Sequence, residues 1–337
     1  MTSAFCWRES RPGLSSGMVV RMRSKKSPAV RSFQFAPLES RQLAGRRRAA
    51  PGACTFPGKS RPANIGTVDR DALDARIRTL LPEQYQDSYE TLQPKPMRSA
   101  GLKYSADGQV AWDEMWGSFC DLALAGGPPH KGALLGPGAA ADIDADFDRY
   151  DEVADEICRG IRMVTGLRAY VSPNPGWVRV SCQGDAMAGW LLRAITTENV
   201  AARRQGALLD LPASPRFSLE KEIKNVITVT AKTCHYWIGH TTRDRQEAIG
   251  DLLRTMERER PLVEPSFDAE GAGWRGVECD SAASAIWMMR ALVASNVLAR
   301  REGTTLFVPV NRETDEGGHR VAAALDVVGA AFRRPGT

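Results

Sequence analysis

Hydrophobic residues recur every three or four positions in several stretches of the chain, a spacing that predicts amphipathic α-helices. The first stretch begins near Val68, and its hydrophobic face consists of Leu73, Ile77, Leu80 and Leu81. The same spacing predicts four later helices, at residues 112–125, 147–164, 218–239 and 243–257. The helix at residues 112–125 ends at Gly126 and Gly127, and the two prolines that follow prevent it from resuming.

One stretch of the pattern occurs twice, at a constant offset of 97 residues that leads from Gly176 to Gly273. The first copy ends at Pro212 and the second ends at Pro309, without a gap in either. The residues that match include Trp177/Trp274, Cys182/Cys279, Trp190/Trp287, Arg193/Arg290, Asn199/Asn296 and Gly206/Gly303. An ungapped match that contains three pairs of rare residues predicts an internal duplication.

Each copy reads as strand, helix, strand, turn and strand. Val178 and Val180 alternate with polar residues, which indicates a half-buried strand, and a helical stripe through Trp190 follows it. A second strand is expected from Val200, and Gly206 supplies the turn into the third. A helix that crosses between two strands covers one face of their sheet. We therefore predict an α/β fold (α+β layered), built from internally duplicated strand–helix–strand–strand modules with additional helices and a pseudo-two-fold relation.

The composition divides the chain into four parts. Residues 1–65 are expected to be a disordered basic leader, and residues 66–172 a helical N-terminal part of the body with a Gly/Pro loop at 126–138. Residues 173–242 would hold the first repeat module and its polar helix, and residues 243–337 a linking helix and the second module. With 43% hydrophobic residues and 8 Trp among 337 residues, the body can supply a hydrophobic core.

The net charge of +5 comes from the leader. Of the 45 Lys and Arg residues, 13 lie at or before Arg61, whereas Glu9 and Glu39 are the only acidic residues in that stretch. The remaining chain therefore carries 32 basic and 38 acidic residues. We expect no nucleic-acid binding through a basic face of the body. The leader itself fits a disordered tail or upstream extension best, with a basic nucleic-acid arm and a transit-peptide-like segment as alternatives.

Residues that match between the copies are expected to hold each module together. Trp190 and Trp287 would anchor the core, and Asn199 and Asn296 would end helices in the left-handed conformation. Cys182 and Cys279 lie where a strand leads into a helix, so each is either a reactive thiol or, more commonly, a small buried hydrophobic residue. Arg193 and Arg290 would pair structurally, with a symmetric pair of anion clamps as the alternative.

Function is more readily expected where the two copies differ. The differences concentrate before the first copy, at GGPPHKG, and after it, on the polar face of helix 218–239. The helix that follows the second copy, VAAALDVVGAAF, has no such polar face. The candidate catalytic groups are His235, Lys232, His130 and Lys131, and the candidate ligand-binding residues are Arg193, Arg290, Asn225, Thr228 and Tyr236.

His235 could serve as a general acid or base. Lys232, one helical turn earlier, would then bind an anionic substrate or lower the pKa of His235. The spacing of His235 and Lys232 also fits exposed residues on a solvated helix face, which is the main alternative. A metal site at Cys234, His235 and His240 is disfavoured, because neighbouring residues on a helix point in different directions and a 235/240 pair lacks the i, i+4 spacing of helical zinc ligands. We therefore predict no metal.

We expect an enzyme that acts on an anionic metabolite in a cleft between the two repeat modules, with no readable reaction type. The alternative is a non-catalytic regulatory or protein-interaction protein built from the duplicated module. Nucleotide-binding and common hydrolase motifs are absent from the sequence, which indicates no particular cofactor. No hydrophobic run reaches the length of about 20 residues that a membrane helix requires, and 7 scattered Cys suggest reduced thiols, so we expect a cytoplasmic protein.

Overall fold

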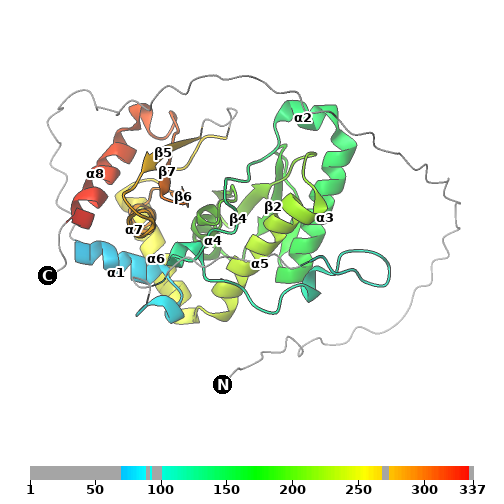
Figure 1. Cartoon of the computed structure of the whole chain (residues 1–337), viewed down its shortest axis with the longest axis horizontal. Helices are drawn as coiled ribbons and strands as arrows, with labels where there is room; N and C mark the ends of the chain where they lie inside the picture. The colour runs from blue at the N-terminus through cyan, green and yellow to red at the C-terminus, as the bar shows by residue number, and fades with distance from the viewer. Residues whose placement is uncertain (1–69, 89–91, 93–100, 268–272, 334–337) are drawn as a thin grey trace, which may run out of the picture. The chain divides into compact units, whose positions relative to one another are not determined.

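The structure, a computed structural model, describes residues 70–88, 92, 101–267 and 273–333 (Figure 1). All of them belong to one compact unit, residues 62–337. The predicted basic leader, residues 1–65, lies outside the described residues. The described part of the chain combines eight α-helices with two antiparallel sheets, so the prediction of a mixed helix-and-sheet fold is confirmed.

The eight helices include those that the hydrophobic spacing predicts near residues 68, 147, 218 and 243. All eight helices are α1 (Arg70–Leu80), α2 (Ala140–Ala145), α3 (Phe147–Thr165), α4 (Asp185–Thr197), α5 (Lys224–Gly239), α6 (Arg243–Glu259), α7 (Ala282–Ala294) and α8 (His319–Arg333). One π-helical turn, η4 (Leu219–Ile223), leads directly into α5. The predicted helix from residue 218 therefore begins with a wider turn before it becomes α-helical.

The predicted helix at residues 112–125 is wrong. This segment forms only two short 3-10 turns, η2 (Trp112–Glu114) and η3 (Ala123–Ala125). Distant side chains bind backbone groups that a helix would have paired internally. The Glu198 carboxylate accepts the Ala123 N–H, and the Tyr236 hydroxyl donates to the Cys120 carbonyl. Tertiary contacts thus override the local spacing, as they commonly do for weak helical patterns.

The larger sheet has the order β1-β2-β4-β3, and the smaller sheet has the order β5-β7-β6. The strands are β1 (Arg168–Val171), β2 (Trp177–Ser181), β3 (Arg203–Gln205), β4 (Leu208–Pro212), β5 (Trp274–Glu278), β6 (Arg300–Glu302) and β7 (Thr305–Pro309). Because β2 and β3 are both antiparallel to β4, they run in the same direction. Helix α4 connects them, and α7 connects β5 and β6 in the same way.

The two sheets pair their strands at equivalent positions. Trp177 lies opposite Pro212 in the larger sheet, and Trp274 lies opposite Pro309 in the smaller one. Among the described non-glycine residues, only Asn199 and Asn296 have a positive φ, which is 62° for both. The prediction that these asparagines follow their helices in the left-handed conformation is therefore confirmed.

Helix α4 packs against β3, β4, α5 and α6, whereas α7 packs against β6, β7, α1 and α8 (Figure 1). The predicted core tryptophans are buried, with Trp190 0% and Trp287 6% exposed. Both indoles hydrogen-bond to α1, since Trp190 Nε1 donates to the Leu80 carbonyl (2.7 Å) and Trp287 Nε1 to the Asp74 carboxylate (3.2 Å). Helix α1 thus holds both α4 and α7 in place.

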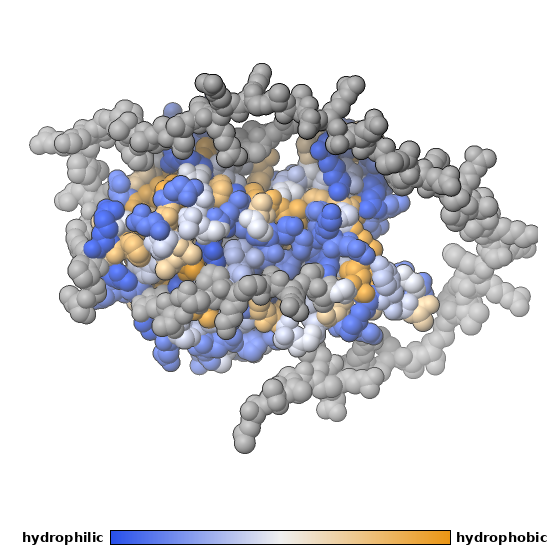
Figure 2. Space-filling view, in the orientation of Figure 1, coloured by the Kyte–Doolittle hydropathy of each residue, from blue (hydrophilic) through white to orange (hydrophobic). Residues whose placement is uncertain are grey.

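Large hydrophobic side chains that remain exposed are spread over several elements. Among the described residues they are Tyr104, Phe147, Met163, Tyr170, Val171, Ile238 and Val310. On the face shown in Figure 2, hydrophobic and hydrophilic residues are interspersed. None of the described helices has the length and hydrophobicity that crossing a membrane requires.

Candidate functional site

The polar face of α5 is covered by the loop that precedes the first repeat. Lys232 is only 1% exposed, so the expectation that it lies on a solvated helix face is wrong. Its ammonium lies 2.8 Å from Oε1 of Glu198, whose side chain is 0% exposed. Burial disfavours the charged form of Lys232, but the neighbouring Glu198 outweighs it and the pKa of Lys232 is raised above its usual value.

Glu198 sits at the C-terminal end of α4 and ties three elements together. Its carboxylate accepts hydrogen bonds from the backbone N–H groups of Ala123 and His130, both at 2.9 Å, in addition to the ion pair with Lys232. A buried carboxylate needs several such partners to compensate for its lost hydration. Glu198 therefore fixes the course of the loop 119–131, defined here as the covering loop, on both α4 and α5.

Further contacts of the covering loop continue along α5 toward its C-terminal end. The Lys232 ammonium also lies 3.0 Å from Sγ of Cys120, a half-buried residue. The Tyr236 hydroxyl donates to the Cys120 carbonyl at 3.2 Å and lies 2.9 Å from the Tyr85 hydroxyl. Tyr85 is in turn 3.0 Å from the Asp121 carboxylate. Burial and this hydroxyl pairing raise the pKa of Tyr85, so both phenols are neutral hydrogen-bonding groups.

His130 is positioned by the same loop at the other end of the polar face. Its Nε2 lies 3.0 Å from Oδ1 of Asn225, and the residue is half-buried. Because an amide oxygen only accepts, Nε2 carries the proton and Nδ1 keeps a lone pair. Burial lowers the pKa of His130 to about 4, so the imidazole is neutral at pH 7 and able to accept a proton. Lys131, also half-buried, follows it directly.

His235 stands apart from His130. It is exposed near the end of α5, and its Nε2 lies 3.0 Å from Nε2 of His240. Asn225, the partner of His130, is ten residues earlier on the helix, which corresponds to about 15 Å along its axis. Partial burial lowers the pKa of His235, and the nearby His240 lowers it further. The structure thus brings His130 and Lys232 together through Glu198, whereas His235 belongs to a separate histidine pair.

The other predicted ligand-binding residues fall into two groups. Thr228 lies on α5, and its buried hydroxyl has no hydrogen-bond partner among the described residues. Arg193 is 0% exposed and binds inside the protein, to the Gly189 carbonyl (2.8 Å) and the Asn296 side chain. Arg290, 3% exposed, donates to the carbonyls of Leu124 and Ala125. Both arginines therefore join elements of the fold, and neither guanidinium faces solvent.

The remaining cysteines favour the structural interpretation. Burial raises the pKa of Cys182 to about 12 and also raises that of Cys279, which makes both thiols poor nucleophiles. Cys234 is 2% exposed and belongs to the hydrophobic core. Within the described part of the chain, no group of three or more His, Cys, Asp or Glu side chains is arranged to hold a metal ion.

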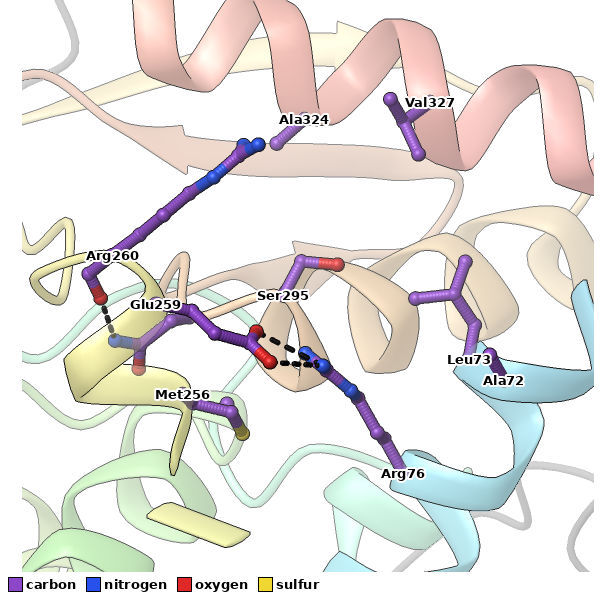
Figure 3. Close-up of a pocket in the computed structure, with 10 residues that line it drawn as sticks. Ala72, Leu73, Arg76, Met256, Glu259, Arg260, Ser295, Ala324 and Val327 are labelled. Atoms are coloured by element: carbon purple, nitrogen blue, oxygen red, sulfur yellow. Dashed lines mark hydrogen bonds and ion pairs between the residues drawn. The ribbon is translucent and has the colours of Figure 1, made fainter. Parts of the chain in front are cut away.

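A separate small pocket of about 130 Å³ lies between α1, α6, α7 and α8 (Figure 3). Arg76 and Glu259 face each other across it as an ion pair of 2.8 Å, and Ser295 lies beside them. Arg260 extends toward Ala324 on the far side. None of the candidate residues named from the sequence lines this pocket.

Sequence reasoning missed Glu198, Cys120, Tyr85 and Asp121. The first of these had a usable signal, because Glu198 lies within the ungapped match but corresponds to Ser295 in the second copy. Cys120 and Asp121 fell inside the wrongly predicted helix, where Cys120 had no reason to be singled out. The chain matches no protein-family model, no curated protein and no solved structure.

Proposed function

We propose that the protein is an enzyme that acts on a small anionic metabolite where the covering loop meets α5. In this proposal His130 transfers a proton through Nδ1, and Lys131 binds the negative charge of the substrate. Lys232 acts as a positioning residue, since Glu198 already neutralises its charge. His235 has no part in the same step, because it lies about 15 Å farther along α5 than Asn225.

The observation that carries the proposal is a neutral histidine held in one orientation beside a cation. The hydrogen bond from His130 to Asn225 fixes the ring, and the lowered pKa of His130 keeps it unprotonated at pH 7. A buried ion pair, Lys232–Glu198, holds the loop that carries it. Buried ionisable groups with perturbed pKa values gather at functional sites more often than elsewhere, although purely structural networks also have them.

The proposal also includes a duplicated architecture in which the site lies at the junction of two pseudo-two-fold-related modules. The equivalent strand pairings and the two left-handed asparagines support it. A further support is that the covering loop touches both copies. Arg301 of the second copy donates to the Gly127 carbonyl (2.9 Å), and Asn199 of the first copy donates to the carbonyls of Lys131 and Arg301.

A thermal-stability screen over small carboxylates, phosphates and sulfonates tests the proposal. A ligand that binds the folded state raises the melting temperature, and at 100 times its Kd it stabilises by about 2.7 kcal/mol. We expect at least one anion to do so, and expect His130→Asn and Lys131→Ala to reduce the shift. His319→Asn is the matched control, because His319 is exposed at the start of α8. A panel without any stabilising anion would instead favour the non-catalytic interaction protein.

A further inference from the structure

The contact between Cys120 and Lys232 has no role in the proton transfer proposed above. The thiol Sγ and the ammonium Nζ are 3.0 Å apart, within reach of a covalent bond after a small movement. Their accessibility differs, because Cys120 is half-buried whereas Lys232 is 1% exposed. A small reagent can therefore reach the Cys120 thiol from solvent, whereas the Lys232 amine is shielded from solvent and lies beside the modified sulfur.

Cys120 is distinct among the five described cysteines. Cys158 and Cys234 are buried, and Cys182 and Cys279 are half-buried like Cys120. Burial raises the pKa of Cys120, as it does those of Cys182 and Cys279, but the adjacent Lys232 ammonium opposes the rise at Cys120. Of the cysteine thiols in the described residues, only that of Cys120 makes a hydrogen bond with an amine. Cys279 is therefore a matched control, since it offers similar exposure without a lysine partner.

We propose that Cys120 and Lys232 are an oxidative cross-linking site, in which hydrogen peroxide produces a covalent sulfur–nitrogen bond. Cys120 first attacks one oxygen of the peroxide, the O–O bond breaks, and a sulfenic acid and one water result. The Lys232 ammonium then passes a proton to the Glu198 carboxylate, 2.8 Å away. The free amine attacks the sulfenic sulfur, the S–O bond breaks, and the departing hydroxide takes a second proton from nitrogen as water.

The sulfur loses two electrons, and the peroxide is reduced to two waters. Condensation of a sulfenic acid with a nearby nitrogen is known for backbone amides, and an amine is a stronger nucleophile than an amide. The product joins the covering loop to α5, removes the charge of Lys232 and leaves Glu198 protonated. A thiol reductant reverses the link by attacking the sulfur and returning both side chains.

The site is tested on the full-length protein by treatment with hydrogen peroxide, followed by alkylation of the remaining thiols and mass spectrometry. We expect a species lighter than the reduced protein by two hydrogen atoms, and a digest in which the Cys120 and Lys232 peptides are joined and trypsin no longer cleaves after Lys232. Dithiothreitol should restore both peptides. Cys120→Ser should abolish the link, whereas Cys279→Ser should leave it unchanged. Circular dichroism of both variants checks that they remain folded.

Three results would overturn the inference. The first is accumulation of sulfenic or sulfinic acid at Cys120 while the Lys232 peptide stays unmodified. The second is a disulfide from Cys120 to another cysteine in place of the nitrogen link. The third is oxidation of Cys279 under conditions in which Cys120 does not react, which would show that the peroxide does not reach the thiol.

Discussion

Helices α5 and α8 occupy equivalent places in the chain, after β4 and β7, and α5 carries a row of polar residues that α8 lacks. At the offset of 97 residues, four polar residues of α5 correspond to small or hydrophobic residues of α8: Asn225/Ala322, Thr228/Leu325, Lys232/Gly329 and His235/Phe332. Each helix packs on the central helix of its own copy, α5 on α4 and α8 on α7. The two helices thus pack in the same way, whereas the polar and ionisable side chains occur on α5 and not at the corresponding positions of α8.

The ion pair shows the same contrast most clearly. At the same offset neither partner is present, since Ser295 stands for Glu198 within the second copy and Gly329 of α8 stands for Lys232. The pocket of about 130 Å³ lies beside Ser295. Removal of one partner of such a pair leaves the other charge buried and unpaired, which is strongly destabilising. The comparison therefore separates packing that the two copies share from a buried ion pair that occurs at only one of the two equivalent places.

The shared scaffold is tested by Trp190→Ala and Trp287→Ala. Each should lower the free energy of unfolding by about 3–5 kcal/mol, because truncating a buried tryptophan leaves a cavity. Urea unfolding of the two variants measures the effect. A free energy of unfolding that stays unchanged in one of the two variants would show that this tryptophan does not anchor the core in the way the other does.

The contrast between the copies is tested by Glu198→Ala against Ser295→Ala. Removing Glu198 should cost about 3–5 kcal/mol, since Lys232 would remain buried without a counter-charge. Ser295→Ala loses one hydrogen bond to the Ala291 carbonyl and should cost about 1 kcal/mol. The double variant Glu198→Leu/Lys232→Met should recover only the part of the loss that comes from the unpaired lysine charge, because the Ala123 and His130 N–H groups still lack their acceptor. Equal losses in the free energy of unfolding for Glu198→Ala and Ser295→Ala would contradict the difference between the two equivalent positions.

Acid sensitivity should come from the covering loop through His130. Its pKa in the folded protein is about 4, below the 6.5 expected in the unfolded chain, so the unfolded state binds the proton first as pH falls. The associated stability is present above pH 6.5 and is lost as pH falls to 4, on the order of 3 kcal/mol in total. Urea unfolding across this range should show a shallower pH dependence in His130→Asn than in the wild type. Identical profiles would contradict the lowered pKa.

The histidine pair at the end of α5 should matter least. His235 is exposed, so His235→Ala should change the free energy of unfolding by no more than about 0.5 kcal/mol. The ligand-induced rise in melting temperature should also survive, because His235 is not part of the proposed proton transfer. Loss of that rise in His235→Ala would extend the site along the whole polar face.

Much of the scaffold could be predicted from hydrophobic spacing alone. The helices α1, α3, α5 and α6 follow from it, and the left-handed conformation of Asn199 follows from its place between a helix and a strand. Such features depend on neighbours in sequence, which a periodic pattern records.

The site was predictable only in part, because it depends on contacts distant in sequence. His130, Lys131, Asn225 and Lys232 were chosen because the copies differ there. Nothing in the spacing of α5 indicated that a loop from residues 119–131 covers its polar face, so Lys232 was expected in solvent. The same distant contacts, made by Glu198 and Tyr236, prevent the helix that the pattern predicted at residues 112–125.

The most direct test of the central claim is hydrogen–deuterium exchange with and without the anion that stabilises the protein most in the screen. If the anion binds where the covering loop meets α5, it should slow exchange in peptides from both of these segments. Peptides from α8 and the end of α6, which surround the pocket near Ser295, should be unchanged. Protection of the α8 side without protection of the covering loop would contradict the account and place the ligand in the pocket of the second copy.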